Sequence, residues 1–158
     1  MLRLCCPDGA WVKRGMTSRQ EAFQKYQNDI YLFSRDIIGI PLYPYQTHVA
    51  QYIMDLVAER RNEAVVIEIS RQAGKNQLAA VTEAAMLARF GRQEVGIVKT
   101  SPTWKPQIVN SKMRFEAMAK RIEHRLPWIK YKPSMGYIYR CGRAMIQFLS
   151  ADPSASVV

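Results

Sequence analysis

The chain has 158 residues, of which 48% are hydrophobic, so it suits one domain with a buried core rather than a disordered chain. No long apolar run is present, and the first fifteen residues have no sustained apolar stretch, so the sequence predicts neither a transmembrane span nor a secretory signal. Three cysteines without a CxxC pair and two histidines argue against a zinc site or a disulfide framework.

The net charge of +10 is concentrated in one stretch of the chain. From Lys99 to Arg143 there are eleven Lys and Arg residues against two acids, Glu116 and Glu123, and the rest of the chain is nearly neutral. A concentrated basic region is typical of proteins that bind polyanions, so it predicts a nucleic-acid partner. It is also compatible with a solvated face, or with an acidic complement elsewhere in a longer chain.

The first part of the chain predicts two helices. Residues 1–16 read as an irregular leader, after which Thr17 or Ser18 caps a helix and forms a capping box with Gln20 and Glu21. We expect this helix to continue until Gly39, because apolar residues recur at helical spacing: Phe23, Tyr26, Ile30, Phe33 and Ile37. The turn LYPYQ, residues 42–46, opens a second helix that ends near residues 60–62, with its apolar stripe at Val49, Ile53, Leu56 and Val57.

The pattern then alternates between strands and helices. AVVIEIS, residues 64–70, predicts a buried strand because it is rich in β-branched residues. Residues 75–90 predict a helix, 94–100 a second strand, 103 to about 123 another helix, and 137–150 a hairpin that turns near Cys141-Gly142. This order predicts an α/β fold with parallel crossovers, preceded by a helical segment.

SRQAGKNQ, residues 70–77, lies between the first predicted strand and its helix and matches half of a phosphate-binding loop. Gly74 and Lys75 fill the second Gly and the Lys of G-x-x-x-x-G-K-[ST], whereas Ile69 replaces the first Gly and Asn76 the Ser/Thr. Backbone N–H groups at a helix N-terminus favour anions, and Lys75 would neutralise the β- and γ-phosphates. Asn76 could offer an amide oxygen to magnesium.

Cations near a helix start oppose the helix dipole, so Arg71 together with Lys75 favours a bound polyanion. A polar loop without a ligand is the alternative interpretation.

SRQAGKN after a predicted strand resembles the Walker A loop of large terminase subunits, the DNA-packaging ATPases of tailed phages and herpesviruses. Members of that family lack the first Gly, and some carry Asn after the Lys. LYPYQ resembles the adenine-recognition motif that the family carries upstream. Gln46 would then bind adenine and Tyr45 would pack on the base, although Gln46 could instead cap its own helix. The resemblance extends from about residue 31 onward.

The resemblance implies a P-loop NTPase-like domain over residues 17–158, with a mainly parallel sheet flanked by helices and incomplete at its C-terminus. It implies ATP and Mg²⁺ as cofactors, Arg71 and Lys75 as catalytic residues, and Asn76 as a magnesium ligand. Its partners would be double-stranded DNA, the small terminase subunit and the portal of the procapsid, in the host cytoplasm. The implied nucleotide contacts are Tyr45, Gln46, Ser70, Arg71, Gln72, Ala73, Gly74, Lys75, Asn76 and Gln77.

A Walker B element, an apolar strand ending in two acids, is not found. Asp152 ends an interrupted run and precedes Pro153, and Glu68 lies within the strand before the loop. We therefore expect an N-terminal piece of a longer protein, without the nuclease domain and inactive alone. One alternative is another P-loop enzyme such as a helicase, although helicases usually have Gly-Lys-Thr. The other is a non-catalytic basic nucleic-acid-binding domain, which would ignore ATP.

Overall fold

The structure, a computed structural model, describes residues 18–151, with side chains from residue 23 onward. The predicted leader, Thr17 and Asp152 lie outside what is described, as do the side chains of Ser18, Gln20 and Glu21, on which the predicted capping box depends. The elements in chain order are α1 (Ser18–Gln27), α2 (Ile30–Leu32), the π-helical η1 (Phe33–Ile38), α3 (Pro44–Ala58), α4 (Lys75–Phe90), β1 (Gly96–Ser101), the π-helical η2 (Trp104–Ile108), α5 (Val109–Arg125), β2 (Lys132–Ser134), β3 (Ile138–Cys141) and β4 (Ala144–Ser150).

The described strands form one four-stranded open sheet in the order β1-β4-β3-β2. Only β1 and β4 run parallel, and the other two pairs are antiparallel. The fold is therefore mixed α/β, as expected, but the described sheet is mostly antiparallel, which corrects the expectation of a mainly parallel sheet. The reason is local: the predicted hairpin forms as β3 and β4, and β2, which was not predicted, extends it by one further antiparallel strand.

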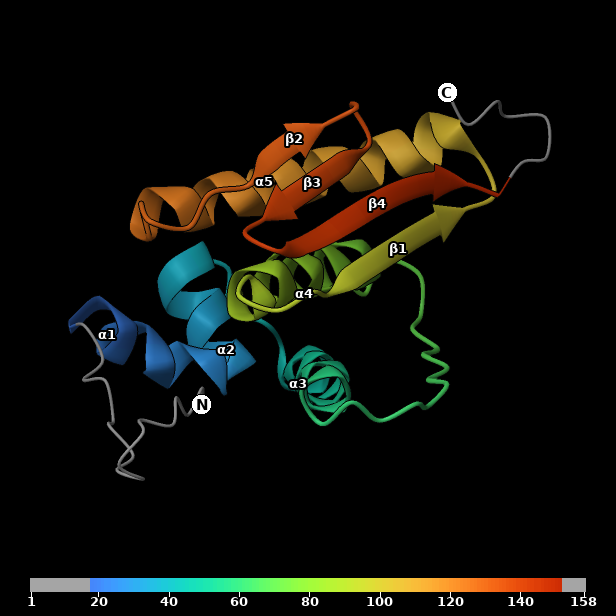
Figure 1. The fold of residues 1–158 in the computed structure, drawn as a ribbon. Coiled ribbons are helices and arrows are strands. Elements are labelled where there is room, and N and C mark those ends of the chain that lie inside the picture. Colours follow the sequence, from blue (N-terminus) through green and yellow to red (C-terminus); the bar gives the residue numbers. More distant parts are fainter. Residues whose placement is uncertain (1–17, 152–158) are drawn as a thin grey trace.

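Helices α4 and α5 lie together on one face of the sheet (Figure 1). On that face, Ile146 and Phe148 of β4 are fully buried. The ring of Phe115 on α5 contacts the rings of Phe148 and Tyr139, with centroids 5.7 and 5.2 Å away. Tyr131 closes the core, because its buried hydroxyl donates to the carbonyl oxygen of Ala84 on α4 at 2.8 Å. Aromatic packing thus fixes both helices to the strands.

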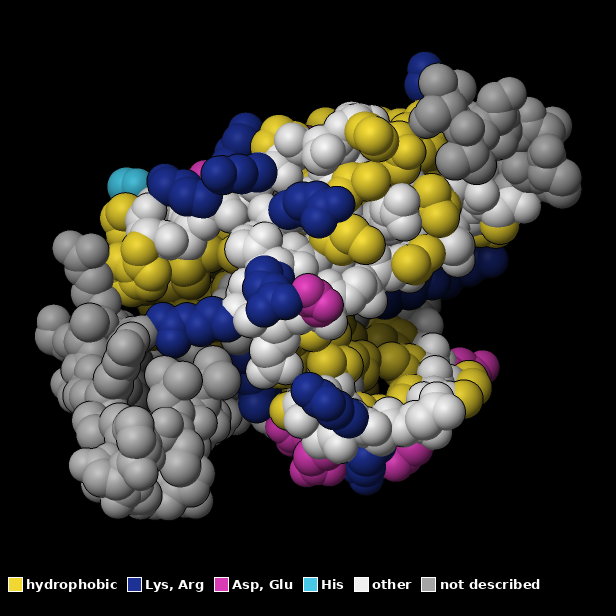
Figure 2. Space-filling model, in the orientation of Figure 1, with side chains coloured by type: hydrophobic (Ala, Val, Ile, Leu, Met, Phe, Trp, Pro, Cys, Tyr) yellow, Lys and Arg dark blue, Asp and Glu magenta, His cyan; other side chains and the backbone are white. Residues whose placement is uncertain are grey.

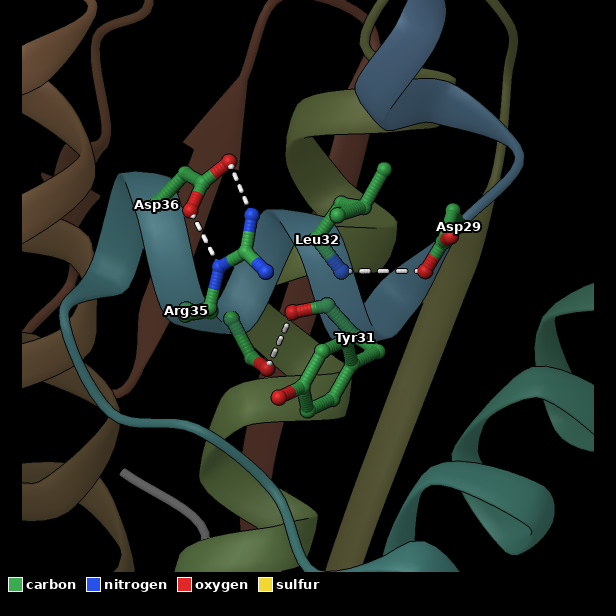
Figure 3. Close-up of polar contacts among 6 residues, drawn as sticks. Asp29, Tyr31, Leu32, Arg35 and Asp36 are labelled. Carbon is green, nitrogen blue, oxygen red and sulfur yellow. Dashed lines mark hydrogen bonds and ion pairs between the residues drawn. The ribbon is translucent and has the colours of Figure 1, made fainter.

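The first predicted helix is broken once, at residues 28–29, and α2 then continues directly into the π-helical η1, which corrects the expectation of one continuous helix. Asp29 has extended backbone (φ −133°) and caps α2 by accepting a hydrogen bond from the backbone N–H of Leu32 at 2.9 Å (Figure 3). This local bond competes with continuing the helix, as Asp side chains often do. The predicted apolar positions Phe23, Ile30, Phe33 and Ile37 are nevertheless buried, and Gly39, with φ +73°, ends η1 as predicted.

The strand predicted at residues 64–70 is not formed, so this prediction is wrong. Residues 61–70 have no regular secondary structure, and Val66 is 94% exposed, with Val65 and Ile67 exposed as well. A strand needs a neighbour to pair its backbone groups. Within residues 18–151, β1 pairs only with β4, so no strand of the described sheet pairs with this segment.

The remaining boundaries follow the sequence closely. α4 spans the predicted residues, and β1 starts two residues later than predicted. The predicted helix from residue 103 begins with a distorted turn, in which Lys105 has extended backbone (φ −110°, ψ 133°). Pro106 follows it, and a residue before proline is disfavoured in the helical region. Regular helix therefore starts at Val109.

Candidate phosphate-binding loop and aromatic hollow

The loop at residues 70–74 leads directly into α4. α4 runs opposite to β1, so its N-terminus lies toward the side of the sheet to which β1 and β4 point (Figure 1). In open α/β sheets this side, beyond the carboxyl ends of parallel strands, is where ligands bind. The placement of the loop therefore suits a ligand, even though the strand expected before it is not formed.

The loop contains two left-handed residues, Gln72 (φ +64°) and Gly74 (φ +73°). Alternation of left-handed and other residues turns successive N–H groups toward a common side and makes a concavity for anions. Gly74 is the N-cap of α4, and its carbonyl oxygen accepts from the N–H groups of Gln77 at 3.0 Å and Leu78 at 2.9 Å. The N–H groups just before these belong to the open first turn of the helix, which has no intrahelical acceptors.

The side chains of the predicted loop residues lie mainly in solvent. Ser70, Arg71, Gln72, Lys75 and Asn76 are exposed, whereas Ala73, Gly74 and Gln77 are half-buried. Lys75 is thus accessible at the first position of α4, where the open N–H groups are also found. The arrangement could hold an anion by combining backbone donors with a mobile charge.

Gln46 lies against this loop but is buried, with 2% of its surface exposed. Its Nε2 donates to the carbonyl oxygen of Ala73 at 3.2 Å, and its Oε1 accepts from the backbone N–H of Tyr43 at 3.1 Å. The Tyr45 hydroxyl donates to the same Ala73 oxygen at 2.8 Å. Gln46 therefore caps its own helix and ties α3 to the loop, and its amide is already bonded on both sides.

A hollow of about 840 Å³, which sequence reasoning missed, lies beside the start of α3. Its apolar lining is Pro41, Leu42 and Pro44, and its polar and aromatic lining is Tyr31, Tyr43, Thr47, His48, Gln51 and Gln77. Because Gln77 belongs to the first turn of α4, the hollow adjoins the candidate phosphate-binding loop. The aromatic and polar residues of LYPYQTH are the sequence signal that could have indicated it.

Two features of the hollow favour a flat polar ligand. Tyr43 is 67% exposed, and its ring lies parallel to that of Tyr45, with centroids 6.0 Å apart. The Oγ1 atom of Thr47 is buried and has no hydrogen-bond partner among the described residues. Tyr31 is held in place at the rim because Arg35 lies over its ring at 5.6 Å, while Arg35 also pairs with Asp36 (Figure 3).

One buried ion pair lies along α4, two turns beyond the loop. Lys99 of β1 and Glu83 of α4 are 2.6 Å apart, and both side chains are largely buried. Burial raises the pKa of Glu83, and the charge of Lys99 only partly opposes this. The other carboxylate oxygen of Glu83, Oε2, has no partner among the described residues.

In residues 18–151, no three His, Cys, Asp or Glu side chains are grouped so that they could hold a metal ion, so Asn76 stands alone as the predicted magnesium ligand. Within the same residues, no helix has the length and apolar character needed to cross a membrane. Comparison of the sequence with protein-family models and with curated proteins found no match.

Proposed function

We propose that this chain is the ATP-binding part of a DNA-packaging terminase large subunit, which couples ATP hydrolysis to movement of double-stranded DNA in the full-length protein. The observation that carries the proposal is the start of α4, where an exposed Lys75 and open backbone N–H groups adjoin an aromatic hollow. A triphosphate joined to a flat base needs these two sites side by side.

The phosphates fit at the N-terminus of α4. The open N–H groups of its first turn would donate to phosphate oxygens, and Lys75 would place a positive charge on the β- and γ-phosphates. Arg71 is exposed in the same loop and could add charge at the γ-phosphate. Asn76 would contribute one oxygen to a magnesium ion, whose role is to neutralise phosphate charge, and phosphate oxygens and waters would complete its shell.

The base fits in the hollow rather than against Gln46. Gln46 is only 2% exposed and its amide is bonded to Tyr43 and Ala73, so it offers a base little accessible surface. In the hollow, the exposed ring of Tyr43 offers a stacking surface, and the exposed His48 and half-buried Gln77 offer polar side chains. This replaces the contact expected from the resemblance with one that leaves α3 tied to the loop.

The proposal includes a P-loop-like sheet that is more parallel than the described one. Residues 64–70 would join it as a strand parallel to β1, with α4 as the crossover behind the sheet. In Figure 1, α4 lies behind β1 and this segment lies beyond the free edge of β1, so a parallel strand formed there would be joined to β1 by a right-handed crossover, which supports the proposal. The double-stranded DNA, small terminase subunit, procapsid portal and host cytoplasm belong to the same proposal.

The test is the affinity for a fluorescent ATP analogue, measured by anisotropy. We expect Lys75→Ala to weaken binding by about 10-fold or more, because it removes a charge-assisted contact of about 1.5–3 kcal/mol. Lys132→Ala is the matched control, since Lys132 is an exposed lysine on β2 away from the loop. Equal affinity of wild type and Lys75→Ala would overturn the proposal.

A second candidate function is a basic nucleic-acid-binding domain that ignores nucleotide. It is favoured by the eleven Lys and Arg residues between Lys99 and Arg143. Binding of DNA without any measurable binding of the ATP analogue would support it. A helicase-like enzyme would bind ATP through Lys75 as well, and unwinding of a forked duplex would distinguish it.

A further inference from the structure

A second hollow, of about 340 Å³, lies between the end of η1 and the last turns of α5. One side is formed by Ile37, Ile38 and Gly39, and the other by four basic side chains, Lys120, Arg121, His124 and Arg125. Among the described residues, no acidic side chain lines this hollow. It contains no residue of the loop at residues 70–77, and it has no lining residue in common with the aromatic hollow beside α4. It is therefore a separate site.

Arg121 builds the hollow. Its Nη1 donates to the carbonyl oxygen of Ile38 at 3.1 Å and thereby holds the end of η1 against α5. Gly39 follows with φ +73°, and a side chain there would approach the Arg121 guanidinium, whose Nη1 lies 3.8 Å from the position of a Cβ. The hollow is therefore a shaped feature between two elements rather than a row of lysines on a flat surface.

The positive charge at this hollow is not neutralised by the acids of α5. Glu123 accepts a hydrogen bond from the backbone N–H of Tyr131 at 2.6 Å, and Glu116 accepts one from the Tyr139 hydroxyl. Both acids of the basic stretch therefore face the strands. Among the described ion pairs, none involves Lys120, Arg121, His124 or Arg125.

The basic side chains continue along the exposed face of α5. Arg114, Arg121 and Arg125 are seven and four residues apart, so they lie nearly in line along one side of the helix. The line spans about 16 Å at 1.5 Å per residue. Figure 2 shows dark-blue side chains gathered in the upper layer at the left, where α5 ends. An extended polyanion, rather than a single small anion, matches this length.

We propose that this hollow and the adjoining face of α5 seat the backbone phosphates of duplex DNA. Phosphate contacts of this kind position a protein on DNA without reading sequence. The inference rests on the DNA partner of the proposed function and is independent of nucleotide binding. His124 and Arg125 also complement the dipole at the end of α5, which is a stabilising role that does not need DNA.

The experiment compares two double variants of the full chain for binding to a labelled duplex by anisotropy over a salt series. Lys120→Ala/Arg125→Ala removes two charges at the hollow, and Lys130→Ala/Lys132→Ala removes two exposed charges elsewhere. We expect the first variant to reduce the slope of log affinity against log salt by about 2 and the second to leave it unchanged. Equal losses in both variants, or none in the first, would overturn the inference.

Three further measurements separate the possible causes of a change in DNA affinity. Thermal unfolding of the first variant should match wild type; a lower melting temperature with unchanged DNA affinity would leave only the helix-dipole role. Inorganic pyrophosphate, tested by calorimetry, should not bind saturably, since saturable binding lost in the first variant would assign the hollow to a free phosphate. Binding of the ATP analogue is measured in the same preparation, so that loss of Lys75-dependent nucleotide binding is not confused with failure at the hollow.

Discussion

Single glycines show how closely the segments of this chain approach one another. Gly74 has φ +73°, and a Cβ there would lie 2.6 Å from Nε2 of Gln46. Position 74 therefore favours glycine for two reasons: its backbone is left-handed at the helix start, and a side chain would collide with the Gln46 amide that ties α3 to the loop. The glycine of the phosphate-binding pattern is thus also a packing residue, and a loss of binding in Gly74→Ala would not by itself demonstrate a phosphate contact.

Gly142 provides the sharpest test of packing at this scale. It has φ +61°, and a Cβ would lie 2.1 Å from the carbonyl oxygen of Gly91, which accepts the N–H of Arg143 at 2.8 Å. We expect Gly142→Ala to lower the free energy of unfolding by at least about 2 kcal/mol, from the left-handed strain and the displaced hydrogen bond. Urea unfolding measures the change.

Gly136→Ala is the matched control for this prediction. Gly136 also has positive φ (+74°), but nothing lies within 4 Å of the added Cβ. It should cost only the strain of the left-handed conformation, about 1–2 kcal/mol. If the two variants were equally destabilised, the contact between Gly142 and Gly91 would have no energetic role.

At the scale of elements, the sequence correctly predicted the helices and strands whose boundaries are determined by local sequence signals. The bounds of α4 were predictable because Gly74 and Gly91 flank an alanine- and leucine-rich run, and the hairpin because Gly142 lies at its turn. The segment at residues 64–70 was not, since a continuous apolar run forms a strand only where another strand pairs with it. Local composition carries no information about that neighbour.

In the candidate site, too, some features were predictable from the local sequence and others were not. The loop and its cations were visible in the sequence, because a short pattern specifies them. The burial of Gln46 and the hollow beside Tyr43 depend on how α3 packs against α4, a contact between residues nearly thirty positions apart. The break at Asp29 was missed because its capping bond competes with an apolar pattern that continues through it.

The ion pair between α4 and β1 yields a prediction at the scale of elements. Lys99→Met should lower the free energy of unfolding by about 3 kcal/mol at pH 7, because it leaves the largely buried Glu83 carboxylate without its partner. Replacing both, as Glu83→Leu/Lys99→Met, should recover most of that loss, since two apolar side chains of similar size need no pairing. Urea unfolding of the single and double variants measures both changes; a double variant no more stable than Lys99→Met would contradict the prediction.

The same pair predicts how stability depends on pH. Burial raises the pKa of Glu83 in the folded state above its ordinary value of 4.5. The stability contributed by this group is therefore fully present below pH 4.5 and is lost as pH rises through the raised pKa. Wild type should show this loss and Glu83→Gln should lack it.

At the scale of the whole molecule, the described sheet is covered on one face only. Val98, Gln147 and Ile138 are aligned across the other face; Val98 is 60% exposed and Gln147 is half-buried, whereas Ile138 is buried. Figure 2 shows hydrophobic side chains on this face, with basic ones around them. Sheets with parallel pairs usually have helices on both faces. The described residues thus bring together groups that could hold a phosphate, as proposed, while the described helices leave the other sheet face and the edge of β1 open.

The described residues offer groups that could bind ATP but not a full set for hydrolysis, which predicts binding without turnover. Phosphoryl transfer depends mainly on positioned charges, and carboxylates that fix magnesium and orient water are part of that set. Residues 18–151 supply backbone donors and Lys75, but no group of three acidic, His or Cys side chains that could hold a metal. We therefore expect the purified 158-residue chain to bind ATP weakly and to release phosphate at the background rate. Phosphate release is measured beside Lys75→Ala, which serves as the blank. Steady hydrolysis that Lys75→Ala abolishes would contradict the prediction. Asp152, which lies outside the described residues, would then be the first carboxylate to substitute, as Asp152→Asn.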